Sequence, residues 1–332
     1  MQTNSIEDKK FVTVMIKMVG TNCNMNCQYC YEHVTDDIHK DFSTSDQVIE
    51  YLKEFVNYEH VFIVFHGGEP LLANKSEVRN ILDFIKANFG NEYRIQFQTN
   101  GTLLDDEWVN MFKQYEPNLS LSISLDPVGK KDLRKMNGLQ YREIVEANLK
   151  RYCREIEKIG VISVAHKFNY TSFEEFVAFL ISIGVKSLTI NKYRDNDWAD
   201  ESYLTEKEYV KMLQLVFLKW VSNGWYKFIN IQPLNSLFSP NGSKICIYLA
   251  DEKKCSYFKT FYSEYEKSEF CDHVVNDELP AVESKCLSCE IYSKCGGGCL
   301  VEKKDETFCE ARKELFKFVE GVKHGSKKTC SE

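Results

Sequence analysis

Residues 11–32 read FVTVMIKMVGTNCNMNCQYCYE, an apolar run followed directly by three closely spaced cysteines. The run at 11–18 is rich in β-branched residues and has the length of a strand. Cys23, Cys27 and Cys30 then lie within eight residues of one another. Three thiols leave a tetrahedral zinc ion one ligand short, or leave one iron of a cubane iron–sulfur cluster open. The stretch therefore predicts a metal site in the loop after the first strand.

The pattern that begins with this strand repeats along the chain to about residue 222. Short apolar runs with the composition of strands alternate with longer amphipathic segments typical of helices. The expected strands are 11–18, 61–66, 93–98, 119–125, 160–166 and 185–191. The expected helices are 43–56, 74–90, 105–115, 141–158, 172–184 and 205–224. Six strand–helix units imply a parallel α/β sheet with right-handed crossovers, and favour a partial (β/α)6 TIM-type barrel over a flat doubly wound sheet.

Beyond the cysteine loop, polar or glycine-rich segments follow three more of the expected strands. HGGEP at 66–70 follows the second strand, QTNG at 98–101 the third, and SLDP at 124–127 overlaps the end of the fourth. In parallel α/β folds, the loops at the carboxyl ends of the strands carry the functional site. We therefore expect these three segments to meet the cysteine loop at one rim of the barrel.

Composition excludes several classes of protein. The 332 residues carry a net charge of −7, which argues against a broad basic face for nucleic acid. No window approaches the roughly 18 consecutive apolar residues of a membrane span, and the polar N-terminus MQTNSIEDKK does not have the form of a signal peptide. We therefore expect a cytoplasmic protein with no nucleic-acid or membrane partner. Thirteen cysteines in a reducing compartment then indicate metal binding or redox chemistry.

The strand–helix rhythm stops after residue 222, and nine of the thirteen cysteines lie between Cys246 and Cys330. This region has little apolar periodicity, so metal would be needed to hold its fold. The expected organisation is a core at 11–222, a linker at 223–250, an iron–sulfur domain at 251–320 and a flexible tail at 321–332. A final amphipathic helix is expected at about 308–319.

The spacing Cys-x3-Cys-x2-Cys, with Tyr29 before the last cysteine, resembles the signature of radical S-adenosylmethionine (SAM) enzymes. In that family three cysteines hold a [4Fe-4S] cluster whose fourth iron binds SAM, and one electron cleaves SAM to methionine and a 5′-deoxyadenosyl radical. The resemblance implies that Gly67, Gly68 and Glu69 meet the SAM amino group and that Tyr29 packs near the adenine. Weaker candidates for ribose or carboxylate contacts, which are equally well explained as polar residues of the rim, are Gln98, Asn100, Ser122 and Ser124.

The later cysteines resemble the SPASM extension of radical SAM enzymes, which binds two auxiliary [4Fe-4S] clusters, so the resemblance implies three clusters in all. Carried over, one auxiliary cluster takes Cys255, Cys271 and Cys299, and the other takes Cys286, Cys289, Cys295 and Cys309. Glu266 stands where the pattern expects glycine, and Phe261 stands where some relatives supply a fourth ligand to the first auxiliary cluster. Cys246 is a candidate replacement, the alternative being an open iron. A structural zinc ribbon is the other interpretation of 286–299.

Asp272 directly follows Cys271, at the position where anaerobic sulfatase-maturing enzymes have the base that deprotonates the substrate. A carboxylate there would accept a proton while the auxiliary cluster takes an electron. The alternative is a carboxylate that caps a turn. We interpret His66 and His273 as structural residues, and Cys153 and Cys330 as plain thiols.

The resemblance implies an oxidoreductase that modifies a peptide or protein side chain by hydrogen abstraction, giving a crosslink, an oxidation or an epimer. The leading hypothesis is a maturase of ribosomally made peptides. The alternative is an anaerobic sulfatase-maturing enzyme that forms formylglycine, favoured by Asp272 but not by Phe261 or by the run SLDPVGKKDLRKMNG at 124–138. The implied partner is a low-potential electron donor such as flavodoxin or ferredoxin. Because the barrel begins near residue 11, the leader of the peptide would be read by a separate leader-peptide-binding protein or by the iron–sulfur domain that caps the barrel. A ferredoxin-like carrier and a zinc-stabilised binding module are the competing classes, and GGEP counts against both.

Overall fold

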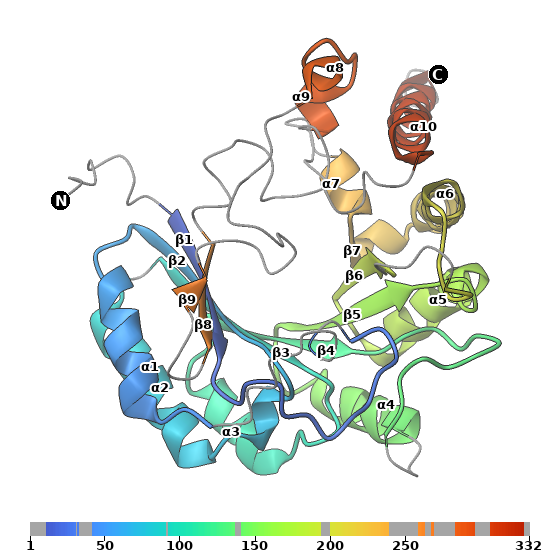
Figure 1. Cartoon of the computed structure of the whole chain (residues 1–332). Coiled ribbons are helices and arrows are strands. Elements are labelled where there is room, and N and C mark those ends of the chain that lie inside the picture. Colours follow the sequence, from blue (N-terminus) through green and yellow to red (C-terminus); the bar gives the residue numbers. More distant parts are fainter. Residues whose placement is uncertain are drawn as a thin grey trace.

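The sheet of this protein has nine strands in the order β7-β6-β5-β4-β3-β2-β1-β8-β9 (Figure 1). The computed structural model describes residues 11–30, 32, 42–90, 92–136, 141–193, 200–238, 258–262, 267–268, 283–295 and 306–328. The six expected strands are β1 (Phe11–Lys17), β2 (His60–Phe65), β3 (Tyr93–Thr99), β4 (Leu119–Ser124), β5 (Ile159–Ala165) and β6 (Ser187–Lys192). These six pair in parallel with their sequence neighbours. The first and last strands of the order are not paired with each other, so the prediction of a partial barrel is confirmed.

Helices cover the outer face of the curved sheet, as Figure 1 shows. They are α1 (Ser45–Leu52), α2 (Lys75–Asn88), α3 (Asp106–Lys113), α4 (Tyr141–Tyr152), α5 (Phe173–Ile183) and α6 (Glu206–Ser222). Several begin at a side-chain cap, as at Thr44 and Thr205, whose hydroxyls form capping boxes with Gln47 and Glu208. Short 3-10 turns lie at η3 (Lys53–Phe55), η4 (Pro70–Leu72), η5 (Tyr170–Ser172) and η6 (Trp225–Lys227).

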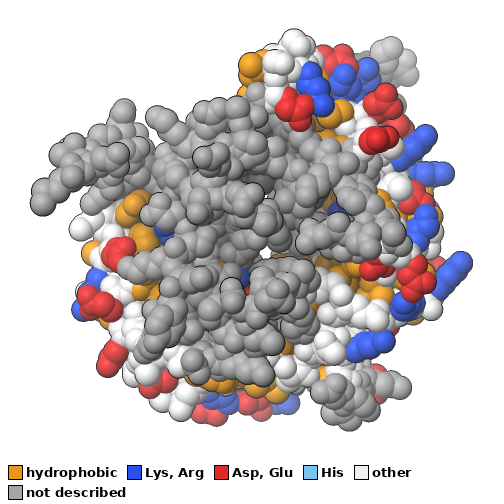
Figure 2. Space-filling view, viewed as in Figure 1, with side chains coloured by type: hydrophobic (Ala, Val, Ile, Leu, Met, Phe, Trp, Pro, Cys, Tyr) orange, Lys and Arg blue, Asp and Glu red, His pale blue; other side chains and the backbone are white. Residues whose placement is uncertain are grey.

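The core lies between this sheet and its helices. Val12, Val14 and Ile16 alternate along β1 and are fully buried, as the period of a strand requires. Phe65 of β2 and Phe97 of β3 stack with ring centroids 4.2 Å apart beneath α3. On the face seen in Figure 2, acidic and basic side chains are intermixed over the described outer helices.

Three strands extend the sheet beyond the expected six. At one edge β7 (Asn230–Gln232) pairs with β6, inside the segment interpreted above as a linker, and α7 (Leu234–Phe238) follows it. At the other edge β8 (Phe258–Tyr262) runs parallel to β1 and pairs with the short β9 (Lys267–Ser268). Phe261 in β8 is buried and packs against Tyr51 of α1, with ring centroids 5.3 Å apart. The position where some relatives have a cluster ligand is thus part of the apolar core in this chain.

From residue 283 onward, the described part of the cysteine-rich region is helical. Two short helices, α8 (Ser284–Leu287) and α9 (Tyr292–Cys295), precede the long α10 (Phe308–Lys328). This last helix packs on α6, where Phe318 meets Phe217 with ring centroids 5.9 Å apart. It continues past the boundary that we place at residue 320. Among the described residues, no helix is both long and apolar enough to cross a membrane.

Candidate active site

Cys23, Cys27 and Cys30 lie in the loop that follows β1, and each thiol is partly buried. Burial raises the pKa of Cys23 to about 11 and that of Cys30 to about 12, and it raises the pKa of Cys27 as well. Negative charge on Cys27 would raise the pKa of Cys23 and of Cys30 further. The thiols are therefore neutral until a metal centre compensates their charge.

The number of thiols in the loop matches an iron–sulfur cluster that keeps one iron open. Within the described ranges, no three His, Cys, Asp or Glu side chains are grouped closely enough to hold a single metal ion. The backbone N–H of Met25 lies 3.4 Å from the sulfur of Cys23 and donates to it, as groups around cluster sulfurs do.

The cysteine loop is held by the segment that follows β4. Met25 and Met136 form an antiparallel bridge. The N–H of Asn26 donates to the carbonyl of Lys135 over 2.7 Å, and the N–H of Gln28 donates to that of Leu133 over 2.8 Å. These contacts fix the backbone on both sides of Cys27.

The GGEP segment after β2 lies directly against the cysteine loop. The N–H of Gly68 donates to the carbonyl of Gly20 over 2.8 Å, and the N–H of Glu69 donates to that of Asn22 over 2.7 Å. A Cβ atom at Gly68 would lie 1.8 Å from the carbonyl oxygen of Asn22, and Gly67 has a φ of +84°. Glycine is required at both positions by the approach of protein backbone and by a left-handed conformation.

Glu69 joins the second loop to the third. Its carboxylate, 1% exposed, accepts from the N–H of Leu71 over 2.9 Å and from the hydroxyl of Thr99 and the N–H of Asn100, both over 2.6 Å. Burial raises the pKa of Glu69, while the three donors act in the opposite direction. An ionised carboxylate has about four acceptor positions, so one remains for a further donor.

Asn100 continues this network to the first loop. Its amide nitrogen donates to Asn24 over 2.8 Å and lies 3.8 Å from the sulfur of Cys23. Its amide oxygen accepts from the hydroxyl and the N–H of Thr102. Asn100 thus orients the cysteine loop.

The other polar candidates lie on strands. Gln98 stands opposite Ser122 in the register of β3 and β4, and Ser122 accepts a hydrogen bond from Gln96. Ser124 is the partly buried last residue of β4.

Tyr29 links the cysteine loop to the far side of the barrel. Its hydroxyl donates to Asp126, and the guanidinium of Arg134 lies 5.4 Å from its ring centroid. The rings of His166 and Tyr193, at the ends of β5 and β6, lie 6.5 and 6.3 Å away. Burial raises the pKa of Tyr29 well above its usual value.

Asp126 is the centre of a polar cluster that our sequence analysis did not single out. It is 2% exposed and accepts from the N–H of Val164 over 2.7 Å, from the hydroxyl of Ser163 over 3.2 Å and from Arg134 over 3.2 Å. The sequence signal that could have identified Asp126 is its place in SLDP, directly after the fourth strand. Its partners lie on other elements, so only the fold could identify them.

A second buried ion pair lies beside the cysteine loop. The ammonium of Lys17, fully buried at the end of β1, is 3.0 Å from the carboxylate of Glu32. The imidazole of His66 lies 4.0 Å from the same carboxylate.

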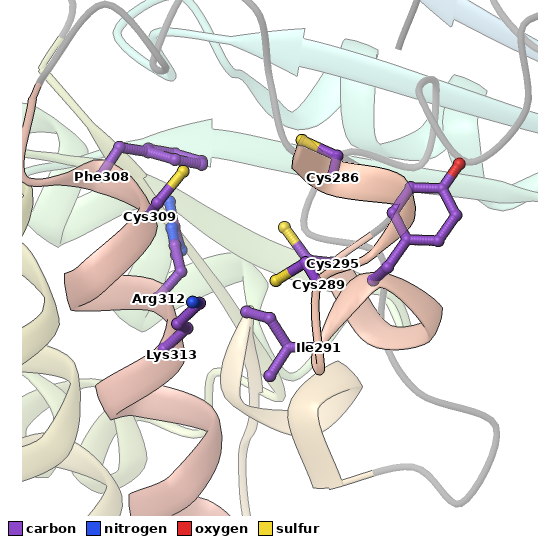
Figure 3. A pocket seen from close by; sticks show the side chains of 9 residues that line it. Cys286, Cys289, Ile291, Cys295, Phe308, Cys309, Arg312 and Lys313 are labelled. Atoms are coloured by element: carbon purple, nitrogen blue, oxygen red, sulfur yellow. The ribbon is translucent and has the colours of Figure 1, made fainter. Parts of the chain in front are cut away.

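Four cysteines of the C-terminal region surround one pocket, shown in Figure 3. Cys286, Cys289 and Cys295 come from the segment of α8 and α9, and Cys309 faces them from the first turn of α10. Also lining the pocket are Ile291, Tyr292, Phe308, Arg312 and Lys313. We name this the cysteine pocket. It brings together the four residues that the sequence analysis assigns to one auxiliary cluster, and their role as ligands stays a prediction.

The remaining predicted site residues lie outside the described residues. They are Cys246, Cys255, Cys271, Asp272 and Cys299. Of the cysteines interpreted as plain thiols, Cys153 is partly buried, and burial raises its pKa to about 11.

Comparisons with known proteins identify relatives. The model of the radical SAM superfamily matches residues 18–180. An uncharacterized protein of Methanocaldococcus jannaschii is 30% identical over 53% of this chain and 61% of its own length. A cysteine-type anaerobic sulfatase-maturating enzyme of Clostridium novyi is 24% identical over 92% of this chain and 95% of its own length.

Solved structures share the fold. A structure of anSMEcpe with bound AdoMet and the Cp18Cys peptide has a TM-score of 0.73 at 19% identity, and covers 96% of this chain and 99% of its own. SuiB of Streptococcus suis, bound to S-adenosylmethionine, has a TM-score of 0.64 at 15% identity, and covers 88% of this chain and 74% of its own. SuiB has also been solved bound to its precursor peptide SuiA.

Proposed function

Because this chain is a radical SAM enzyme related to the anaerobic sulfatase-maturating enzymes, we propose that it modifies a side chain of a peptide or protein by hydrogen abstraction. The observation that carries this proposal is the cysteine loop, whose three thiols share one locality and are held by backbone from two further loops. The peptides bound to anSMEcpe and SuiB, which have this fold, support a peptide substrate. The product would be a crosslink, an oxidised side chain or an epimer.

The residues of the loop fit a [4Fe-4S] cluster that binds SAM. Cys23, Cys27 and Cys30 supply three ligands, which leaves one iron for SAM. When bound, the cluster and SAM supply a 5′-deoxyadenosyl radical. Glu69 would accept from the SAM amino group at its remaining acceptor position, and Tyr29, fixed by Asp126, would pack beside the adenine. Enclosure by the barrel would exclude water from the reacting atoms.

The cysteines of the C-terminal region would hold two auxiliary clusters. We assign one to the four thiols of the cysteine pocket. The other would take Cys255, Cys271 and Cys299, with Cys246 as the candidate fourth ligand. Asp272, next to Cys271, would take a proton from the substrate.

The partners and the compartment follow from the same chemistry. A low-potential flavodoxin or ferredoxin would deliver the electron, and a separate protein would bind the leader of the peptide substrate. Both the enzyme and these partners would be cytoplasmic, since the chemistry requires reduced thiols.

Maturation of a ribosomally made peptide is our first candidate, and formylglycine formation in a sulfatase is the second. Phe261 supports the first, because it is a core residue packed against Tyr51 at a position where some relatives have a cluster ligand. The second is supported by the sulfatase-maturating relative, which aligns along nearly the whole chain.

Cleavage of SAM tests the reaction class. The anaerobically purified and reduced protein should release 5′-deoxyadenosine from SAM, and changing Cys23, Cys27 and Cys30 together to alanine should abolish this release. Cys153→Ala is the matched control, because it removes a partly buried thiol elsewhere and should leave release unchanged. Release by the triple variant would contradict the assignment.

The substrate class is tested with two kinds of peptide. A sulfatase-derived peptide with a target cysteine should yield an aldehyde if the second candidate is right. Peptides encoded beside the enzyme's own gene should instead change in mass if the first is right. Release of 5′-deoxyadenosine that neither peptide stimulates would contradict a peptide substrate.

A further inference from the structure

Three buried charged side chains join the barrel to the cysteine-rich region. The ammonium of Lys192, at the end of β6, lies 3.1 Å from one carboxylate oxygen of Glu206, in the first turn of α6. The guanidinium of Arg312, on α10, pairs with the other oxygen. The side chains of Lys192, Glu206 and Arg312 are 3%, 0% and 1% exposed. We call these residues the ion triad.

Aromatic rings surround the triad. The guanidinium of Arg312 lies 5.0 Å from the ring centroid of Phe308 and 5.7 Å from that of Tyr209. The ammonium of Lys192 lies 5.1 Å from the ring centroid of Tyr203. Burial of three charges carries a large desolvation cost, and apolar residues of similar volume often replace such triads without loss of stability. The triad is therefore poorly explained by stability alone.

Arg312 also lines the cysteine pocket. It lies one helical turn after Cys309, on the same side of α10, and Figure 3 shows the two side chains next to each other. Thiolates that hold an iron–sulfur cluster form an anionic centre, and charge and hydrogen bonding near such a centre set its reduction potential. A buried guanidinium acts on that centre with little screening by solvent.

We propose that Arg312 is a positioning residue that raises the reduction potential of the centre held in the cysteine pocket and, through Glu206 and Lys192, fixes that pocket to the end of β6. The inference rests on the proposed function in one respect, namely that the pocket holds an auxiliary cluster. Arg312, Lys192 and Glu206 together carry one net positive charge. Loss of Arg312 reduces that charge to zero, and neutralisation of Glu206 raises it to two.

The test is a redox titration of the full chain, followed by electron paramagnetic resonance in the Cys23/Cys27/Cys30→Ala background. The signal that disappears in Cys286→Ala identifies the centre of the pocket. Arg312→Gln should lower its midpoint potential, so that the reduced-to-oxidised ratio at a fixed potential falls about tenfold, or 59 mV for a one-electron couple. Glu206→Gln should shift the potential upwards.

Opposite shifts of the midpoint potential in Arg312→Gln and Glu206→Gln distinguish this electrostatic role from a structural one. If either change merely loosened α10, the midpoint potential would shift in the same direction in both variants. Lys313→Gln is the matched control, since Lys313 lines the same pocket but is partly exposed, and its shift should be much smaller. Shifts of the same sign in Arg312→Gln and Glu206→Gln, or an unchanged potential in Arg312→Gln, would overturn the proposal.

A second variant covers the case in which Arg312→Gln does not fold. Lys192→Met, Glu206→Leu and Arg312→Met together replace the triad by apolar side chains of similar size, and should also lower the potential. An unchanged potential in this variant would overturn the proposal. Failure of the proposed function is a different result: Cys286→Ala would then remove neither iron nor a signal.

Discussion

The cysteine loop and the cysteine pocket bring thiols together in different ways. The loop offers three thiols, and its backbone is held by hydrogen bonds to the segments after β2 and β4. The pocket offers four thiols, three from α8 and α9 and one from α10, and α10 is fixed to the barrel by packing and by the ion triad. A three-thiol site leaves a coordination position for a substrate, whereas a four-thiol site is closed. Under our proposal, the first site would therefore carry the chemistry and the second would transfer electrons.

Loss of one ligand at each site gives the sharpest contrast. Cys27→Ala should lower SAM cleavage by more than about a hundredfold, since changes outside the ligand shell alone cost up to that factor. Cys295→Ala should leave SAM cleavage within about twofold of the parent but abolish product formation, because it affects only the pocket. Chromatography of 5′-deoxyadenosine and mass spectrometry of the peptide measure the two quantities. Equal loss of SAM cleavage in both variants would contradict the different roles that we give to the cysteine loop and the cysteine pocket.

Gly68→Ala tests how the cysteine loop is held. The added methyl group would meet the backbone of Asn22 at 1.8 Å, so the loops must separate at a cost of about 3 kcal/mol in the free energy of unfolding. Urea unfolding and the iron content of the Cys23/Cys27/Cys30 site should both show the effect. Gly90→Ala is the control, because nothing lies within 4 Å of the added atom. A normal iron content in Gly68→Ala would contradict the role of this contact.

Phe261→Cys tests whether position 261 belongs to the apolar core or lies next to an auxiliary cluster. Because Phe261 packs against Tyr51, the change should cost about 2–4 kcal/mol of unfolding free energy and add no iron. Phe228→Cys, at a side chain that is 55% exposed, should cost far less. A gain of iron in Phe261→Cys would show that the position faces a cluster after all.

Tyr29→Phe should have the smallest effect. The change removes one hydrogen bond to Asp126, which keeps its donors Ser163, Val164 and Arg134. A loss of about 1 kcal/mol corresponds to a roughly fivefold weaker binding of SAM. Equilibrium dialysis with labelled SAM measures it, and Tyr226→Phe, at an exposed tyrosine, is the control. Unchanged binding would remove Tyr29 from the SAM site.

Local patterns predicted the barrel because its strands and helices repeat with clear periods. The same reasoning failed for β7 and β8, which are short and exist through pairing with β6 and β1. The resemblance to the SPASM extension implied which four cysteines line the pocket. It could not predict that Glu206 is buried, because its partners Lys192 and Arg312 lie on other elements and only the fold brings the three charges together.

Synthesis of this chain must leave one side of β1 without its strand partner for a long time. β8 pairs with β1 from Thr13 and Phe258 onward, so the partner emerges from the ribosome more than 200 residues after the strand it completes. At about 5–20 residues per second, the delay lasts on the order of tens of seconds. An exposed strand edge invites pairing with other chains. The edge of β1 beside the cysteine loop therefore stays open to such pairing until Phe258–Tyr262 has emerged.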